Sequence, residues 1–349
     1  MVLENFRNYS KISVSTDADL VLILGENAAG KTNFLESIYF LSRLKSFRAP
    51  DELLIKQGED FFGLKGAVGS RQLEVVMQKS PSTKRGYKID GQKTPKSLWQ
   101  AFRNVLFVPG DLNLFILGPS ARRKFLDDIL AQKNKEYALA LVSLDHVLKQ
   151  KSALLEALNQ GQGDLNQLDF WNDQLAEFSE TIAEARQGFV DFLTSRFSQT
   201  NQSLTGFGSK FSVEFKTQAN TKQGFLEKLG LLREAEIRSQ MNLVGPHRDD
   251  FTLAKDGVLN IYNSSRGELR MQILALKLLQ AEFLSDGENK PIILLDDVFS
   301  ELDETRRTKL IENLQGHQIF ITSTEEHHLP KFTKAVLVLK VENNGIIGL

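Results

Sequence analysis

The chain reads Leu20-Val21-Leu22-Ile23-Leu24-Gly25-Glu26-Asn27-Ala28-Ala29-Gly30-Lys31-Thr32 at residues 20–32. The opening apolar run ends at a glycine, which predicts a buried strand of a parallel sheet. The following residues, from Gly25 to Thr32, fit the pattern G-x-x-x-x-G-K-[ST]. Strand, loop and helix in this order predict a phosphate-binding P-loop. The expected helix is amphipathic, with one side formed by Phe34, Leu35, Ile38, Leu41 and Leu44.

The residue types of this loop suit a nucleoside triphosphate. Glycines let the backbone curl around phosphates, so that successive N–H groups and the helix N-terminus point at the anion. We expect Lys31 to reach the β and γ phosphates and Thr32 to offer its hydroxyl to Mg²⁺. ATP and Mg²⁺ are therefore the predicted ligands. The predicted nucleotide-binding residues here are Gly25, Glu26, Asn27, Ala28, Ala29, Gly30, Lys31 and Thr32, with Lys31 also catalytic and Thr32 also a metal ligand.

A pair of acids follows a later apolar run. Residues 292–295 read Ile-Ile-Leu-Leu and lead directly into Asp296 and Asp297. A P-loop enzyme needs an acid on the metal side at the end of a neighbouring buried strand. We expect Asp296 to hold the Mg²⁺ shell and Asp297 to position or deprotonate the attacking water. About 260 residues separate this pair from the P-loop, so a large segment is inserted between the two halves of the ATP site.

A third element, Ser264-Ser265-Arg266-Gly267-Glu268, precedes a helix predicted from Leu269 toward Leu284. Serine, glycine and an acid at a helix start form another phosphate-facing N-terminus. In the ABC-type ATPases the equivalent S-x-G-[QE] signature acts in trans, closing over ATP held by the partner's P-loop. We therefore predict that Ser265, Gly267 and Glu268 contact nucleotide bound to a second copy. Ordinary N-capping by a serine is the alternative.

The rest of the pattern predicts an α/β fold of the ABC-type P-loop ATPase head, with a parallel core sheet plus an antiparallel β subdomain. Residues 61–90 alternate in the manner of antiparallel strands, and a further hairpin is expected around Asp256-Gly257. Between residues 137 and 192 apolar residues recur at alternating spacings of three and four, which predicts an antiparallel helical hairpin over about 135–199. The predicted head comprises residues 1–115 and 235–349, and an inserted helical lobe spans 116–234. Further parallel strands are predicted at 105–108, 319–321 and 335–339.

Composition narrows the class of protein. The 349 residues include no cysteine, which excludes disulfides, thiolate metal sites and a catalytic thiol. No apolar run has the length of a membrane span, and the first twenty residues lack the apolar core of an export signal, so we expect a cytoplasmic protein without membrane contact. Net charge is −1, yet residues 43–124 hold 16 basic and 7 acidic residues.

This basic surplus suits a polyanion, although a solvated surface without a ligand stays an equal alternative. The candidates for a DNA-contacting face are Arg43, Lys45, Arg48, Lys84, Arg85, Lys88, Lys93 and Lys96.

Ordered motifs along nearly the whole chain resemble those of the RecF family, bacterial recombination and repair ATPases related to SMC-type heads. The resemblance implies an ATP-dependent head-to-head dimer that binds gapped DNA and single-strand to double-strand junctions. It also implies slow ATP hydrolysis and partnership with RecR and RecO in loading the recombinase RecA. It places Thr322-Ser323-Thr324 where such heads carry a switch residue near the γ-phosphate. The motifs are Asn5-Phe6-Arg7-Asn8-Tyr9, the P-loop, residues 32–48, Phe107-Val108-Pro109, residues 118–127, Gly245-Pro246-His247-Arg248-Asp249-Asp250, the serine signature and residues 295–303.

The chain departs from the family pattern at three places. Residues before Asn5 are few, so we expect a weak first strand at the edge of the β subdomain. Gly110 stands between Pro109 and the acid Asp111, which leaves the role of that loop open. The second acid after the strand is Asp297, whereas most ABC-type ATPases use the longer Glu, and this favours a slow, timing ATPase. The resemblance implies that this weak ATPase depends on DNA.

Two other functions fit parts of the pattern. An SMC-like structural ATPase would need arms far longer than the roughly 60 helical residues predicted here. A small-molecule P-loop kinase would need a substrate pocket and an arginine-bearing lid, and it would leave the serine signature without a purpose.

Overall fold

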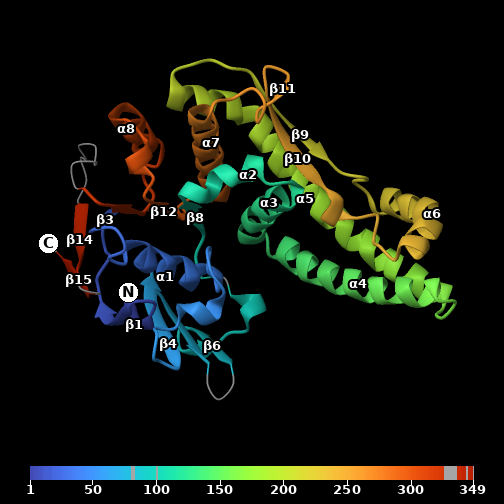
Figure 1. The fold of residues 1–349 in the computed structure, drawn as a ribbon, viewed down its shortest axis with the longest axis horizontal. Coiled ribbons are helices and arrows are strands. Elements are labelled where there is room, and N and C mark those ends of the chain that lie inside the picture. The colour runs from blue at the N-terminus through green and yellow to red at the C-terminus, as the bar shows by residue number, and fades with distance from the viewer. Residues whose placement is uncertain (80–82, 100, 326–335, 343–344, 349) are drawn as a thin grey trace. The chain divides into compact units, whose positions relative to one another are not determined.

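The computed structural model describes residues 1–79, 83–99, 101–325, 336–342 and 345–348 (Figure 1). The chain forms two compact units, Met1–Asp111 with Gln280–Leu349 and Leu112–Leu279. Residues 235–279, which the sequence analysis assigns to the head, pack within the second unit. Packing alone does not say which segments make up one ATP-binding head, so the predicted domain division stays a prediction.

A six-stranded, mainly parallel sheet forms one layer of the first unit, in the order β15-β14-β3-β13-β12-β8. Neighbours from β14 to β8 pair in parallel, and β15 closes the edge antiparallel to β14. Parallel strands end at the same edge of a sheet, so the segments after β3, β12 and β13 meet there. The strands are β3 Leu20–Leu24, β8 Asn104–Phe107, β12 Ile292–Asp296, β13 Ile319–Ser323, β14 Val336–Glu342 and β15 Gly345–Gly348.

Each apolar run predicted as a parallel strand forms one in this sheet. Residues 292–296 are buried throughout, as a strand covered on both faces requires. Ala335, the first residue of the last predicted run, lies outside the described residues.

A second, antiparallel sheet in the same unit has the order β2-β1-β4-β5-β6-β7. Leu73, Val75 and Met77 on β5 are buried, so the alternation of residues 61–90 faces the core on one side. The expected weak first strand is wrong, because β1 pairs with β2 on one side and β4 on the other. The strands are β1 Val2–Phe6, β2 Tyr9–Ser13, β4 Phe61–Val68, β5 Arg71–Gln78, β6 Lys84–Ile89 and β7 Gln92–Lys93.

Helix α1, Lys31–Arg43, lies between these two sheets (Figure 1). It contacts β12 and β13 of the parallel sheet and β1, β4 and β5 of the antiparallel one. Every residue from Phe34 to Ser42 is buried, so the helix is the middle of one continuous core rather than a surface helix with one apolar side. The unit also contains α8 Glu304–Asn313 and the short 3₁₀ helices Asp51–Leu54, Lys96–Leu98 and Phe299–Glu301.

The second unit is mainly helical. Helices α4, Lys135–Asn159, and α5, Leu165–Thr205, pack along each other and are joined through Gly161 and Gly163, both at positive φ (Figure 1). The hairpin expected around Asp256-Gly257 joins β10 to β11, and β9 pairs on the other side of β10. The elements are α2 Asn113–Ile116, α3 Pro119–Lys133, α6 Lys222–Ser239, β9 Phe211–Lys216, β10 Asp250–Lys255, β11 Val258–Leu259, and the 3₁₀ turns Pro109–Leu112 and Pro246–Arg248. Helix α7, Arg266–Leu284, begins in this unit and ends among residues of the first.

The predicted fold class is confirmed, since a parallel core sheet, an antiparallel β subdomain and a helical insertion are all present. Across the described ranges, no helix is both long and apolar enough to span a bilayer.

A buried ion pair joins α4 to α6 in the second unit. The Nζ atom of Lys151 lies 2.7 Å from an Oε atom of Glu236, and both side chains are fully buried. The other carboxylate oxygen of Glu236 accepts a hydrogen bond from the N–H of Leu243 at 2.8 Å. Burial lowers the pKa of Lys151, and the Glu236 carboxylate opposes that shift. Each charge is tolerable in the core only because the other is there.

We predict that Lys151→Met destabilises the second unit by about 3–5 kcal/mol, because it leaves the Glu236 carboxylate buried and unpaired. Lys149→Met, on the same helix, removes an exposed ion pair with Asp145 and should change stability by less than about 0.5 kcal/mol. Urea unfolding followed by circular dichroism measures both. Lys151→Met combined with Glu236→Gln should recover part of the loss, and a single variant as stable as Lys149→Met would contradict the prediction.

Candidate functional site

The P-loop runs between β3 and α1 and depends on glycine at two positions. A Cβ at Gly25 would lie 2.7 Å from the carbonyl oxygen of Val341 on β14. Gly30 has a φ of +120°, and a Cβ there would lie 2.5 Å from Nδ2 of Asn8. Any other residue at these positions would push the loop away from its neighbours. Ala28 also has a positive φ, of 65°, which gives the loop its curl.

The side chain of Lys31 folds back over this loop. Its ammonium donates hydrogen bonds to the carbonyl oxygens of Gly25 at 2.8 Å and Glu26 at 2.9 Å. Burial lowers the pKa of Lys31, and the carboxylates of Asp297 and Asp296 raise it in opposition. The cation is therefore held beside the loop opening, close to two acids from a distant part of the sequence.

The sheet brings Thr32 and Asp296 into direct contact. The Thr32 hydroxyl donates to Oδ1 of Asp296 at 2.8 Å, and the hydroxyl of Thr322 on β13 donates to the same atom at 2.9 Å. Burial raises the pKa of Asp296, and the two hydroxyl hydrogen bonds act against that shift. A hydroxyl and a carboxylate side by side are the ligands that Mg²⁺ takes from proteins when phosphates and water complete its shell.

Asp297 is the next residue and is exposed. Its backbone has a φ of +52°, an uncommon conformation for aspartate, and its N–H donates to the Thr322 hydroxyl at 2.9 Å. Thr322 therefore fixes both acids, one through its carboxylate and the other through its backbone. Within the part of the chain that the structure describes, no group of three or more His, Cys, Asp or Glu side chains is placed to hold a metal.

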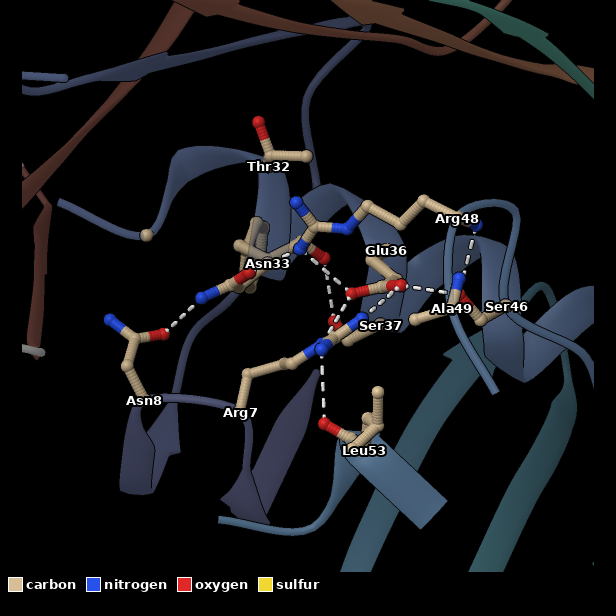
Figure 2. Close-up of polar contacts among 12 residues, drawn as sticks. Arg7, Asn8, Thr32, Asn33, Glu36, Ser37, Ser46, Arg48, Ala49 and Leu53 are labelled. Carbon is tan, nitrogen blue, oxygen red and sulfur yellow. Dashed lines mark hydrogen bonds and ion pairs between the residues drawn. The ribbon is translucent and has the colours of Figure 1, made fainter. Parts of the chain in front are cut away.

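One flank of the P-loop carries a dense polar network (Figure 2). At its centre is the Glu36 carboxylate, which is fully buried on α1 and contacts Arg7, Ser46 and Arg48. Burial raises the pKa of Glu36, but the hydrogen bonds from these partners outweigh it and hold the pKa below its usual value. Arg7, Arg48 and Asn8 also line a hollow of about 1040 Å³ on this side of the first unit.

The serine signature begins helix α7 in the second unit. The N–H of Ser265 donates to an Oε atom of Glu268 at 2.8 Å, and the Ser265 hydroxyl accepts from the N–H of Glu268 at 3.3 Å. This is a reciprocal capping box, so the N-capping alternative describes the local structure correctly. Lys255 also donates to Glu268 at 2.5 Å, and these contacts lower the pKa of Glu268 to about 2. Ser265, Gly267 and Glu268 are all exposed.

The predicted DNA-contacting residues fall into three groups. Lys84, Lys88 and Lys93 are exposed on β6 and β7 and share one face of the antiparallel sheet, opposite its core. Arg48 is instead committed to the Glu36 network, and Arg85 lies near Asp51. Arg43 closes helix α1, Lys45 follows it, and Lys96 begins a short exposed 3₁₀ helix.

Comparison with known families matches residues 1–347 to the RecF/RecN/SMC N-terminal domain. Curated relatives named DNA replication and repair protein RecF are 36% identical in Moorella thermoacetica, over 94% of this chain and 90% of the relative, and 35% identical in Streptococcus equi subsp. zooepidemicus, over 99% and 96%. The chain belongs to the RecF family. The resemblance noted in the sequence motifs is thereby confirmed for the whole length of this RecF-family chain.

Solved structures agree with the assignment. The recombination mediator protein RecF with ATP, in the RecFOR pathway, superposes with a TM-score of 0.91 at 27% identity, covering 100% of this chain and 96% of that one. An SMC head bound to the C-terminal winged-helix domain of ScpA has a TM-score of 0.54 at 14% identity, which shows the shared head fold alone. RecF is a family of ABC/SMC-type ATPases.

Sequence reasoning missed the contributions of Asn8, Tyr9 and Glu36. Asn8 and Tyr9 donate to P-loop carbonyl oxygens, those of Ala29 at 3.1 Å and Gly30 at 2.9 Å. The sequence held little signal for Glu36, because an amphipathic helix could have turned it toward solvent, whereas the structure buries every residue of α1 from Phe34 to Ser42. A carboxylate inside such a helix must have partners in the core.

We predict that Lys255→Met raises the pKa of Glu268 from about 2 back toward its ordinary value, because the Lys255 ammonium is the largest cause of the shift. A folded-state pKa below the unfolded one contributes stability that is present above the ordinary value and lost as pH falls toward 2. Carbon-detected NMR titration of the Glu268 carboxyl measures the shift directly. Lys210→Met is the matched control, because it removes one positive charge at the residue directly before β9. This variant should leave the pKa of Glu268 unchanged. An unchanged pKa of Glu268 in Lys255→Met would contradict the geometry.

Proposed function

We propose that this chain is a DNA replication and repair protein that binds ATP, dimerises head to head around it and holds DNA until slow hydrolysis releases the dimer. The observation that carries the proposal is the contact of Thr32 with Asp296. It joins a P-loop to an acid that stands 264 positions away in sequence. The fold alone does not require a hydroxyl beside a carboxylate at the end of a curled, glycine-dependent loop. Binding of a nucleotide with its metal does require it.

ATP is the proposed ligand of residues 25–32. Backbone N–H groups of the loop and the N-terminus of α1 would bind the phosphates, and the Lys31 ammonium would exchange its carbonyl partners for phosphate oxygens. Thr32 and Asp296 would hold Mg²⁺, which when bound offsets negative charge on the phosphates. The solved RecF relative was obtained with ATP, and this supports the same ligand here.

Hydrolysis would depend on Asp297. Its carboxylate is exposed and its backbone is held by Thr322, which supports a role in orienting or deprotonating a water molecule. Aspartate is one methylene shorter than the glutamate of most ABC-type ATPases, which supports a slow reaction. The proposal includes stimulation of this ATPase by DNA, as the family resemblance implies.

Dimerisation would use the α7 N-terminus. Gly267 lies in the first turn of α7, glycine has a low helix propensity, and a Cβ there would meet no atom of the described residues within 4 Å. The chain itself therefore gives no reason for glycine at this exposed position. Close approach of a second copy's triphosphate supplies one, with Ser265, Gly267 and Glu268 facing it.

DNA would lie along the outer face of the antiparallel sheet. Lys88 stands directly opposite Lys93 across β6 and β7, and it also lies 3.5 Å from the Glu74 carboxylate on the same face. Lys65 shares that carboxylate at 3.4 Å, so positive charge stays in excess on this face, and an anion lying over it would be favourable. Lys84 continues the same face at the start of β6. The RecFOR setting of the solved relative supports RecR and RecO as further partners.

The expected outcome for Lys31→Met is loss of ATP binding and, with it, of ATP-dependent dimerisation. Ser265→Arg should still bind ATP as a monomer but fail to dimerise, because an arginine at the α7 N-terminus blocks the second copy's phosphates. Sedimentation velocity with and without a non-hydrolysable ATP analogue separates the two. Ser203→Arg, an exposed position on α5, is the control. A wild-type chain that stays monomeric with the analogue would refute the dimer mechanism.

For DNA, the variant Lys84→Ala/Lys88→Ala/Lys93→Ala should weaken binding to gapped duplex and reduce the slope of log K against log salt by about 2–3, at roughly 0.9 per lost phosphate contact. Lys149→Ala/Lys216→Ala/Lys228→Ala changes the net charge equally on the other unit and should leave the slope unchanged. Fluorescence anisotropy over a range of salt concentrations measures both. Equal slopes in the two variants would place the DNA elsewhere.

A further inference from the structure

Glu36 is a charged residue in the core, where it needs partners of opposite charge. Its carboxylate is fully buried on α1 and accepts from Arg7 Nε at 2.8 Å and Arg7 Nη2 at 2.9 Å, from Arg48 Nη2 at 2.9 Å and from the Ser46 hydroxyl at 2.5 Å. Figure 2 shows the two guanidinium groups converging on it from opposite sides. A carboxylate that is buried this deeply holds its partners in position, because losing any of these hydrogen bonds would leave a buried charge unsatisfied.

The guanidinium of Arg7 is fixed by hydrogen bonds to Glu36 and to a backbone carbonyl oxygen. Besides its two bonds to Glu36, it donates from Nη1 to the carbonyl oxygen of Leu53 at 3.0 Å. Its backbone has a φ of +55°, so the β1–β2 turn contains a residue in a conformation that non-glycine residues seldom adopt. The Glu36 contact keeps this turn in place against its own backbone preference.

The next two residues of the turn contact the P-loop. Asn8 donates to the carbonyl oxygen of Ala29 at 3.1 Å, and the Tyr9 hydroxyl donates to that of Gly30 at 2.9 Å. Burial raises the pKa of Tyr9, which keeps this donor protonated. Asn33 donates in turn to Oδ1 of Asn8 at 2.7 Å and fixes its orientation.

These two carbonyl contacts help to fix where two N–H groups point, together with the hydrogen bond that the Gly30 carbonyl oxygen accepts from the N–H of Phe34 on α1 at 3.0 Å. In a trans peptide the C=O of one residue and the N–H of the next point in opposite directions within a rigid plane. Holding the oxygens of Ala29 and Gly30 against the turn therefore directs the N–H groups of Gly30 and Lys31 away from it. Those are N–H groups of the loop that is proposed to receive phosphate.

We propose that Glu36 is a positioning residue of the nucleotide site, which acts through Arg7 and the β1–β2 turn to set the direction of the Gly30 and Lys31 amides. It touches no ligand itself. The inference rests on the proposed binding of ATP at residues 25–32. According to this inference, the buried Glu36 carboxylate contributes to the affinity for the triphosphate, although it lies on the far side of the loop.

A double-mutant cycle tests the pathway. Glu36→Gln removes the charge that holds Arg7, and Asn8→Ala cuts the turn from the Ala29 carbonyl without disturbing the buried charge. Each variant should raise the Kd for ATP by about tenfold, and the double variant by little more than either one, because both break the same linkage. Glu59→Gln is the control, since Glu59 is exposed and its carboxylate accepts a long hydrogen bond of 3.3 Å from Asn5.

The measurement is ATP titration calorimetry on the full chain without DNA, at a temperature where circular dichroism shows every variant folded. A lower melting temperature with unchanged Kd in Glu36→Gln would make the residue structural only and overturn the proposal. So would effects of the two single variants that multiply in the double variant, since Glu36 would then act by another route.

Should Glu36→Gln fail to fold, Arg7→Lys replaces it in the cycle, because lysine keeps the buried charge paired but cannot make the paired hydrogen bonds. The same two outcomes then decide. If the wild-type chain itself does not bind ATP, the proposed function fails. If the wild type binds and the variants bind equally well, only the role of Glu36 fails.

Discussion

The hydrogen bond between Thr32 and Asp296 is the point on which the proposed chemistry depends. It exists because β3, β13 and β12 are neighbours in a parallel sheet whose carboxyl ends meet at one edge. Thr322, on the strand between β3 and β12, donates to the same carboxylate and so fixes the end of β12 against β13. Two halves of a site that are far apart in sequence are thus aligned by strand register, and the intervening residues are free to form a separate unit.

The P-loop is braced from its other side by side chains rather than by the sheet. Helix α1 is buried between two sheets, so any polar residue it carries must find partners in the core. Glu36 does so by gathering Arg7 and Arg48, which belong to segments on either side of the loop in sequence. The second unit follows the same rule, because buried Arg186 on α5 pairs with both Asp127 and Asp249. Buried charges in this protein fix the positions of loops and turns that a hydrophobic core could not specify.

The capping box at Ser265 shows how one local structure serves two interpretations. Serine and glutamate satisfy each other's backbone groups, as at many helix starts, and this alone accounts for both residue types. Gly267 is not accounted for in that way, since glycine has a low helix propensity and a Cβ at this position would meet no atom of the described residues within 4 Å. The argument for a second copy at this helix therefore depends on the glycine rather than on the serine that first drew attention to it.

The sequence by itself determined the strand–loop–helix of residues 20–43, the parallel strands and the pair of acids, because apolar runs and glycine spacing express local backbone requirements. It also identified the family, since ordered motifs along the chain matched one family throughout. Only the tertiary structure decided which side chains meet: that Thr322 serves Asp296, that β1 is paired on both sides, and that Glu36 is the partner of Arg7. The physical reason is that periodicity records which way a residue faces, whereas a hydrogen bond between distant segments depends on strand order and register, which no local pattern encodes.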